Sequence, residues 1–242
     1  MNGKRCLVVG ASGGIGAALV RILAARSDVA TVYAAARDVG KIAAGTKCVA
    51  VTIDLGDEDS MAVAAASIGA EGPLDLVIVA TGLLHREPDI APEKSWRAID
   101  AAAMADVFRI NAIGPALIGK HFIELLRAEG RPVFAAISAR VGSISDNRLG
   151  GWHSYRASKA ALNQIMRNFA IELWRRNKGA LAVSLHPGTV ETALSAPFSG
   201  NVPDGKLFSA DHSAQCLIDV IDGLDAKDSG GFFAWDGQPV PY

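Results

Sequence analysis

Short, continuously apolar runs alternate with longer helical patterns along the whole sequence. The predicted strands occupy residues 5–9, 29–35, 48–53, 74–80, 132–138, 181–186 and 231–235, and the predicted helices lie near 14–26, 57–69, 95–128, 153–176 and 210–222. Strands without polar alternation are typical of a parallel sheet covered by helices on both faces. The helical segments are long enough to connect parallel strands. We therefore expect one α/β domain over residues 1–242, with a doubly wound parallel sheet of about seven strands.

The composition excludes several classes of partner. Half of the residues are apolar and 20% are charged, which is typical of a globular chain without a long disordered tail. The 24 Lys and Arg residues nearly balance the 25 Asp and Glu residues, so the formal net charge is −1. Because there is also no basic run, we expect neither nucleic acid nor a membrane surface as a partner.

The cysteines and the apolar runs bear on the compartment. Cys6, Cys48 and Cys216 lie far apart and lack the spacing of a zinc site or a disulfide framework. The first apolar strand is too short for the apolar region of a signal peptide, and no run reaches the ~18 apolar residues that a membrane-spanning helix requires. We therefore expect a cytoplasmic protein with reduced thiols and without a bound metal.

A glycine-rich loop lies between the first predicted strand and the first predicted helix. Glycines let the backbone turn sharply and approach a pyrophosphate, and a helix N-terminus supplies unpaired N–H groups and partial positive charge. The order of strand, loop and helix therefore predicts a dinucleotide site, although a purely structural turn stays open. The loop residues concerned are Gly10, Ser12, Gly13, Gly14, Ile15 and Gly16.

The end of the second predicted strand bears on the choice of cofactor. Ala36 occupies the position where an NAD-binding domain usually carries a carboxylate, and Arg37 follows it. An arginine can form charge-assisted hydrogen bonds with a 2′-phosphate, whereas a carboxylate would repel it. The sequence thus favours NADP(H), while NAD(H) stays open because Asp38 can take the carboxylate role and Arg37 can be an ordinary surface charge.

Tyr155 and Lys159 are four residues apart in the predicted helix 153–176. At ~100° per residue, their side chains lie on one face of the helix, about 40° apart. Lowering a tyrosine pKa from near 10 by about three units requires about 4 kcal/mol of preferential phenolate stabilisation. One ammonium at ~4 Å and an effective dielectric near 20 supplies about that much. The pair therefore indicates an acid/base group at neutral pH, although an incidental Tyr–Lys pair is common on helices.

With these motifs in this order, the sequence resembles the short-chain dehydrogenase/reductase family over essentially all of its length. The resemblance implies a single-domain Rossmann-type fold in which loop glycines hold the pyrophosphate and Asp54 and Leu55 meet the adenine. It also implies that Tyr155 is the acid/base, that Lys159 binds the nicotinamide ribose and lowers the tyrosine pKa, and that Asn111 holds a proton-relay water.

Two further segments match the family in part. Pro187, Gly188, Val190 and Thr192 resemble the family's segment that fixes the nicotinamide carboxamide. Where the family usually has Asn-Asn-Ala-Gly, this chain has Val79 followed by the predicted cofactor contacts Ala80, Thr81 and Gly82. The usual asparagine contacts are therefore missing, and Thr81 can replace one hydrogen bond.

The serine that normally orients the substrate is also missing. Aligning Arg140-Val141-Gly142 with the family's segment places Ala139 at the serine position. Ser143, which can turn back into the site, is our preferred replacement, with no serine at all as the alternative. Ser138 is expected to point to the opposite face of its strand. Loss of this hydroxyl is worth around 10²–10³-fold in rate, so a slow reductase is compatible with Ala139.

Within the family, segments around residues 111–121, 138–145 and 230–237 most resemble C-factor signalling proteins and sniffer-type carbonyl reductases. The resemblance implies an NADP(H)-dependent oxidoreductase that acts on a small-molecule carbonyl or secondary alcohol and forms a homodimer or homotetramer. The alternative is a nucleotide-sensing or signalling protein with weak or no turnover. A short substrate loop is expected near 193–208, and His85, Trp152 and His153 are expected at the wall of the pocket.

Overall fold

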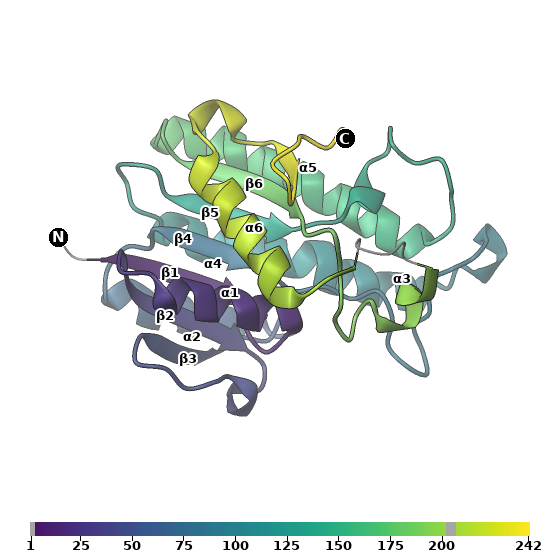
Figure 1. The fold of residues 1–242 in the computed structure, drawn as a ribbon, viewed down its shortest axis with the longest axis horizontal. Helices are drawn as coiled ribbons and strands as arrows, with labels where there is room; N and C mark the ends of the chain where they lie inside the picture. Colours follow the sequence, from purple (N-terminus) through teal and green to yellow (C-terminus); the bar gives the residue numbers. More distant parts are fainter. Residues whose placement is uncertain (1–2, 202–206) are drawn as a thin grey trace.

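The computed structural model describes residues 3–201 and 207–242 and has a seven-stranded parallel sheet at its centre (Figure 1). The order of the strands is β3-β2-β1-β4-β5-β6-β9, which is a doubly wound arrangement and confirms the predicted Rossmann-type fold. The strand bounds are β1 (Lys4–Val9), β2 (Val29–Ala36), β3 (Cys48–Thr52), β4 (Leu76–Val79), β5 (Val133–Ile137), β6 (Leu181–His186) and β9 (Phe232–Ala234).

Helices cover both faces of this sheet, which explains why its strands are apolar on both sides. Helices α1 (Gly14–Ala25) and α6 (Ala210–Gly223) lie on one face, in front of the sheet in Figure 1. Helices α2 (Glu58–Ala70), α4 (Gly114–Phe122) and α5 (His153–Arg176) lie on the other. Each layer encloses its own apolar core against the sheet.

The predicted helix 95–128 is interrupted. The regular part begins at α3 (Ala101–Phe108), because the Asp100 carboxylate accepts a hydrogen bond of 2.8 Å from the Ala103 N–H and so caps the helix. A π-helical turn over Arg109–Ile113 separates α3 from α4, and a 3₁₀ turn over Ile123–Leu125 ends the segment. Such π turns are frequent at functional sites, and this one carries Asn111.

The segment Ala101–Leu125 is the exception to the predicted absence of a membrane-spanning run. By length and composition it is apolar enough to cross a membrane, with a mean hydropathy of 1.3 over its most apolar window. One third of that window is buried inside the protein. A core helix also meets these criteria, so this one segment is weak evidence for a membrane span.

A small second sheet flanks the predicted substrate loop. Strand β7 (Thr189–Val190) pairs in parallel with β8 (Leu207–Phe208), a pairing that the sequence pattern does not reveal because each strand has two residues. A 3₁₀ helix over Ala196–Asn201 lies between them in the chain. Residues 202–206 of the predicted loop 193–208 are outside the described residues.

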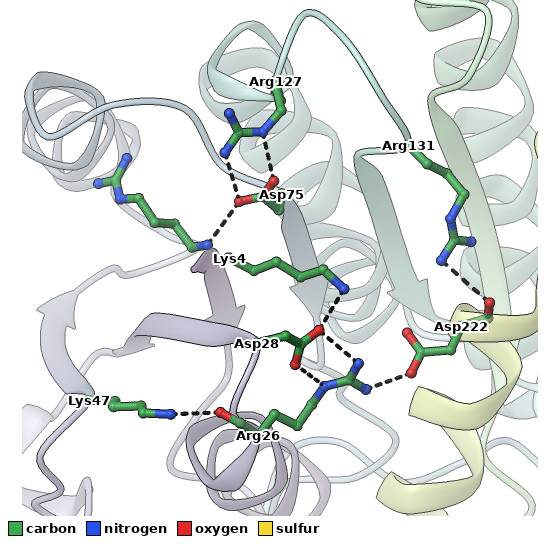
Figure 2. Close-up of polar contacts among 9 residues, drawn as sticks. Lys4, Arg26, Asp28, Lys47, Asp75, Arg127, Arg131 and Asp222 are labelled. Atoms are coloured by element: carbon green, nitrogen blue, oxygen red, sulfur yellow. Dashed lines mark hydrogen bonds and ion pairs between the residues drawn. The ribbon is translucent and has the colours of Figure 1, made fainter. Parts of the chain in front are cut away.

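Charged side chains join the elements at the amino-terminal edge of the main sheet (Figure 2). Arg26, after α1, pairs with Asp28 at 2.9 Å and with Asp222 of α6 at 2.5 Å, and Arg127 pairs with Asp75 at 2.7 Å. A cavity of about 280 Å³ lies among these groups. These charged groups are paired with one another, so their role is to link secondary-structure elements. We therefore place the functional site at the opposite, carboxyl-terminal edge of the sheet.

Candidate active site

A cavity of about 670 Å³ opens at the carboxyl ends of β4, β5 and β6, beside the start of α1. This is the edge where ligands bind in open α/β sheets. The cavity brings together residues from five separate segments of the sequence. The predicted site residues that line it are Gly13, Gly14, Ile15, Gly16, Ala80, Thr81, Gly82, Ser138, Tyr155, Lys159, Pro187, Gly188, Val190 and Thr192.

The glycine loop forms one end of the cavity. Gly10 has a φ of +91°, which a residue with a side chain rarely adopts, and a Cβ at Gly16 would lie 2.0 Å from the Gly10 carbonyl oxygen. Gly13 is the N-cap of α1 and offers no side chain to the free N–H groups of the first turn. The exposed Ser12 lies beside it. A loop of this kind fits a pyrophosphate, because unpaired N–H groups and the helix dipole both attract the anion.

The predicted adenosine contacts lie outside the residues that line this cavity. Arg37 follows β2 and is exposed, and Asp54 follows the neighbouring β3, so the two residues lie at the same sheet edge. The Asp54 carboxylate accepts a hydrogen bond of 2.9 Å from Gly56 N–H. The Leu55 side chain is buried and contacts Gly114 of α4, where a Cβ would approach it to 2.8 Å.

Tyr155 and Lys159 lie one turn apart on α5 and both face the cavity. The Lys159 Nζ donates a 2.8 Å hydrogen bond to the Ile137 carbonyl at the end of β5 and lies 5.8 Å from the centre of the Tyr155 ring. Burial raises the pKa of the Tyr155 phenol to about 12 and lowers the pKa of the Lys159 ammonium to about 7.

These directions correct one expectation. The four-residue spacing predicts that Lys159 lowers the tyrosine pKa, whereas burial raises the pKa of Tyr155 in the protein without a bound cofactor. Removal of both groups from water is the cause, since it disfavours the phenolate and also the ammonium that would stabilise it. Lys159 is instead able to take up or release a proton near neutral pH.

Asn111 lies in the π turn, fully buried behind the cavity. Its Nδ2 donates to the Leu83 carbonyl at 2.8 Å and to the Ser158 Oγ at 3.0 Å, and its Oδ1 accepts from Leu83 N–H at 2.7 Å. The amide therefore links the loop after β4 to helix α5. Only the second lone pair of Oδ1 is left for the water predicted from the family resemblance.

The two candidate serines differ in their surroundings. Ser143, preferred from its spacing, does not line the cavity, and its Oγ accepts a 3.1 Å hydrogen bond from Asp146 N–H. Ser138 lines the cavity, is 1% exposed, and its Oγ has no hydrogen-bond partner among the described residues. Ala139, which the family resemblance aligns with the serine, also lines the cavity and carries no hydroxyl.

Two further buried polar atoms in the cavity, besides the Ser138 Oγ, fit a polar ligand. The Thr81 Oγ1 and the His186 Nδ1 are buried without a partner within the described part of the chain. Buried polar groups are normally hydrogen-bonded, so unpaired ones at a cavity indicate a ligand or water. Burial lowers the pKa of His186 to about 4, which keeps its ring neutral. Sequence analysis missed His186 as a site residue, although its place directly before Pro187-Gly188 is a signal.

Aromatic rings form the other end of the cavity. Trp152 and His85, expected at this wall, do line it, together with Phe198 from the predicted substrate loop. His153 does not. Within the described residues, no group of three or more His, Cys, Asp or Glu side chains could hold a metal ion. The arrangement thus provides a dinucleotide cradle at one end, an apolar wall at the other, and a Tyr–Lys pair between them.

Known proteins match this chain over most of its length. The model of the short chain dehydrogenase family matches residues 4–202. The C-signal of Myxococcus xanthus is 36% identical over 174 residues, which are 71% of this chain and 94% of that protein. The 1-hydroxy-2-glutathionyl-2-methyl-3-butene dehydrogenase of Rhodococcus sp. (strain AD45) is 32% identical over 232 residues, 96% of each chain.

The fold comparison agrees with these matches. The NADPH-bound carbonyl reductase from chicken fatty liver superimposes with a TM-score of 0.85 and 28% identity, covering 100% of both chains. The family match spans the glycine loop, the Tyr–Lys helix and the Pro-Gly segment, which the fold brings to one cavity. The chain therefore belongs to the short-chain dehydrogenase/reductase family of oxidoreductases.

Proposed function

We propose that the protein is an NADP(H)-dependent oxidoreductase that transfers hydride between a nicotinamide and a carbonyl or secondary alcohol. The observation that carries this proposal is the buried Tyr155–Lys159 pair, which lies in one cavity with the glycine loop. A phenol beside an ammonium, next to a dinucleotide cradle, is suited to proton transfer coupled to hydride transfer. The direct test is NADPH oxidation with a panel of aldehydes, ketones and quinones.

Residues along the cavity, together with Arg37 outside it, would hold the cofactor. The N–H groups at the start of α1 would bind the pyrophosphate, and Arg37 would pair with the 2′-phosphate. Thr81 Oγ1 and the Pro187-Gly188 backbone line the position expected for the nicotinamide end. When bound, the cofactor supplies or accepts the hydride.

The side chains of the chain manage the proton. In the reduction direction, the Tyr155 phenol donates its proton to the oxygen of the carbonyl as that oxygen becomes an alkoxide. Lys159, whose pKa lies at about 7, can then return a proton to Tyr155 at neutral pH. Asn111 holds the loop after β4 against α5 and is proposed to contact the water that leads to solvent.

Cofactor preference gives the first prediction. Arg37→Ala is expected to weaken NADPH binding roughly 10-fold, the size of one lost charge-assisted hydrogen bond. NADH binding should stay unchanged, because NADH has no 2′-phosphate. Calorimetric titration of both proteins with both cofactors measures this. Tighter binding of NADH than NADPH by the wild-type chain would contradict the NADP(H) assignment.

The lowered pKa of Lys159 gives a second prediction, on stability. Because the pKa is about 7 in the folded chain and near 10.4 in an unfolded one, the unfolded chain binds more protons between these values. Stability should therefore rise with pH over this window. We expect the wild-type Tm without cofactor to increase by several degrees from pH 7 to pH 9, and the Tm of Lys159→Met to stay nearly flat. Scanning fluorimetry measures both Tm values as a function of pH. Parallel curves for the two proteins would contradict the lowered pKa of Lys159.

A nucleotide-sensing protein is the second candidate function. Two observations favour it: the 36% identity to C-signal and the absence of a hydroxyl at Ala139. It predicts tight NADP(H) binding with negligible turnover on the whole panel of carbonyls. Running the titration and the turnover assay on one protein preparation separates the two functions.

A homodimer or homotetramer is proposed as the working form. Ile113, Ile171 and Trp174, at the start of α4 and on α5, are 46–50% exposed, and burying such apolar side chains favours association. Size-exclusion chromatography with light scattering measures the assembly. The cytoplasmic location stays a prediction.

A further inference from the structure

The turn that leads into the catalytic helix has an unusual backbone. Gly150, Gly151 and Trp152 all have positive φ, at +65°, +65° and +51°. Among the described residues, Trp152 is the one non-glycine residue with this conformation. A bulky residue in the left-handed region is unfavourable and persists only where its surroundings fix it. Contacts with neighbouring segments must therefore hold Trp152 in this conformation.

Glu93 holds this turn against α5. Its carbonyl accepts a 2.6 Å hydrogen bond from Trp152 N–H, and its carboxylate accepts 3.2 Å hydrogen bonds from Ser154 N–H and another from the Ser154 Oγ. Glu93 is only 7% exposed, and its charge faces the N-terminus of α5, which favours an anion. From the other side, Arg156 Nε donates to the Gly151 carbonyl at 3.0 Å.

The fixed turn places the Trp152 indole in the wall of the cavity. The indole lies edge to face with Tyr155, at 6.2 Å between ring centres and 77°, and with Phe198, at 5.3 Å and 63°. His85 continues the series by contacting Phe198 at 5.6 Å, while its Nε2 lies 3.1 Å from the Ala193 carbonyl. One aromatic surface therefore runs from the proposed proton donor to the substrate loop.

We propose that Trp152 is a specificity-determining residue that selects carbonyl substrates with a flat, apolar ring attached to the C=O, and that Glu93 is its positioning residue. This inference rests on the proposed function. A flat ring can join the series through offset or edge-to-face contacts at 4.5–7 Å, which a saturated ring cannot make. With the substrate oxygen at Tyr155, the adjacent ring would meet Trp152 first, because these two side chains are neighbours in the wall.

Binding in a complex that cannot react separates this inference from catalysis. Acetophenone and cyclohexyl methyl ketone have the same heavy atoms and differ in ring flatness, and neither can be reduced in the presence of NADP⁺. Calorimetric titration of the NADP⁺ complex should show acetophenone binding roughly 5-fold to 10-fold more tightly in the wild type. Trp152→Ala should bring the ratio near 1, and Trp152→Phe should keep most of it. Trp96→Ala, which removes an indole that is 65% exposed, is the matched control and should change nothing.

Glu93 is tested in the same assay. Glu93→Ala should lower the ratio of the two ketone affinities as Trp152→Ala does, without changing the Kd of NADP⁺. Glu93→Gln keeps an acceptor for Ser154 N–H and should therefore keep the wild-type ratio. Equal binding of the two ketones by the wild type, or an unchanged ratio in Trp152→Ala, would overturn the inference. If the protein does not bind NADP⁺, the proposed function fails instead, and the same ketone ratio measured on the protein alone still tests Trp152.

Discussion

Replacing Tyr155 by phenylalanine is expected to lower kcat for carbonyl reduction by about 10²–10⁴-fold, the usual size of a lost general acid. The proposed mechanism places the Tyr155 phenol at the substrate oxygen as the proton donor, and its pKa of about 12 keeps it protonated at neutral pH. Phenylalanine keeps the shape and the edge-to-face contact with Trp152. The Kd of NADPH should therefore change little, and the loss should be in kcat.

Steady-state kinetics and calorimetry on the same protein measure this difference. Tyr242→Phe is the matched control, because Tyr242 is 46% exposed and its hydroxyl contacts the Gly230 carbonyl, away from the cavity. Its kcat should equal that of the wild type. If Tyr155→Phe retained wild-type turnover, the proposed chemistry would have to be abandoned, even with NADPH binding intact.

The sheet was predictable because most of its strands are buried on both faces and so appear as continuous apolar runs, although the edge strand β3 is largely exposed. Six-residue β6 matches its predicted bounds, 181–186, and α5 matches 153–176. The interruption of the helix 95–128 at Asn111 was not predictable, because the π turn depends on contacts of the Asn111 amide with Leu83 and Ser158 in other segments. The two-residue strands β7 and β8 are too short to leave a pattern in the sequence.

The site was predictable where a motif is local in the sequence. The glycine loop and the Tyr155–Lys159 pair follow from spacing alone, and both line the cavity. The directions of the Tyr155 and Lys159 pKa shifts were not predictable, because they depend on burial by other elements of the fold. The contact between Glu93 and Ser154 joins residues far apart in the sequence, so no spacing could indicate it.

Ala139→Ser is expected to raise kcat by up to about 10²-fold. A donor aimed at a developing oxyanion is worth about 10²–10³-fold when removed from sites that have one, and here position 139 lines the cavity without a hydroxyl. The backbone of Ala139 is extended, with φ −148° and ψ 144°, which serine adopts without strain. The added hydroxyl would therefore need no rearrangement of the turn.

Ser138→Ala is the matched control for this gain, and the two variants together decide between three arrangements. If the chain works without a serine, Ser138→Ala leaves kcat unchanged and Ala139→Ser raises it. If the unpaired Ser138 hydroxyl already orients the substrate, Ser138→Ala lowers kcat by a similar factor, and Ala139→Ser adds little. If the protein senses nucleotides, turnover stays negligible in both variants while NADPH binds. A higher kcat in Ala139→Ser would therefore show that the chain is a reductase slowed by the absence of a hydroxyl at position 139, and not a protein without reductase activity.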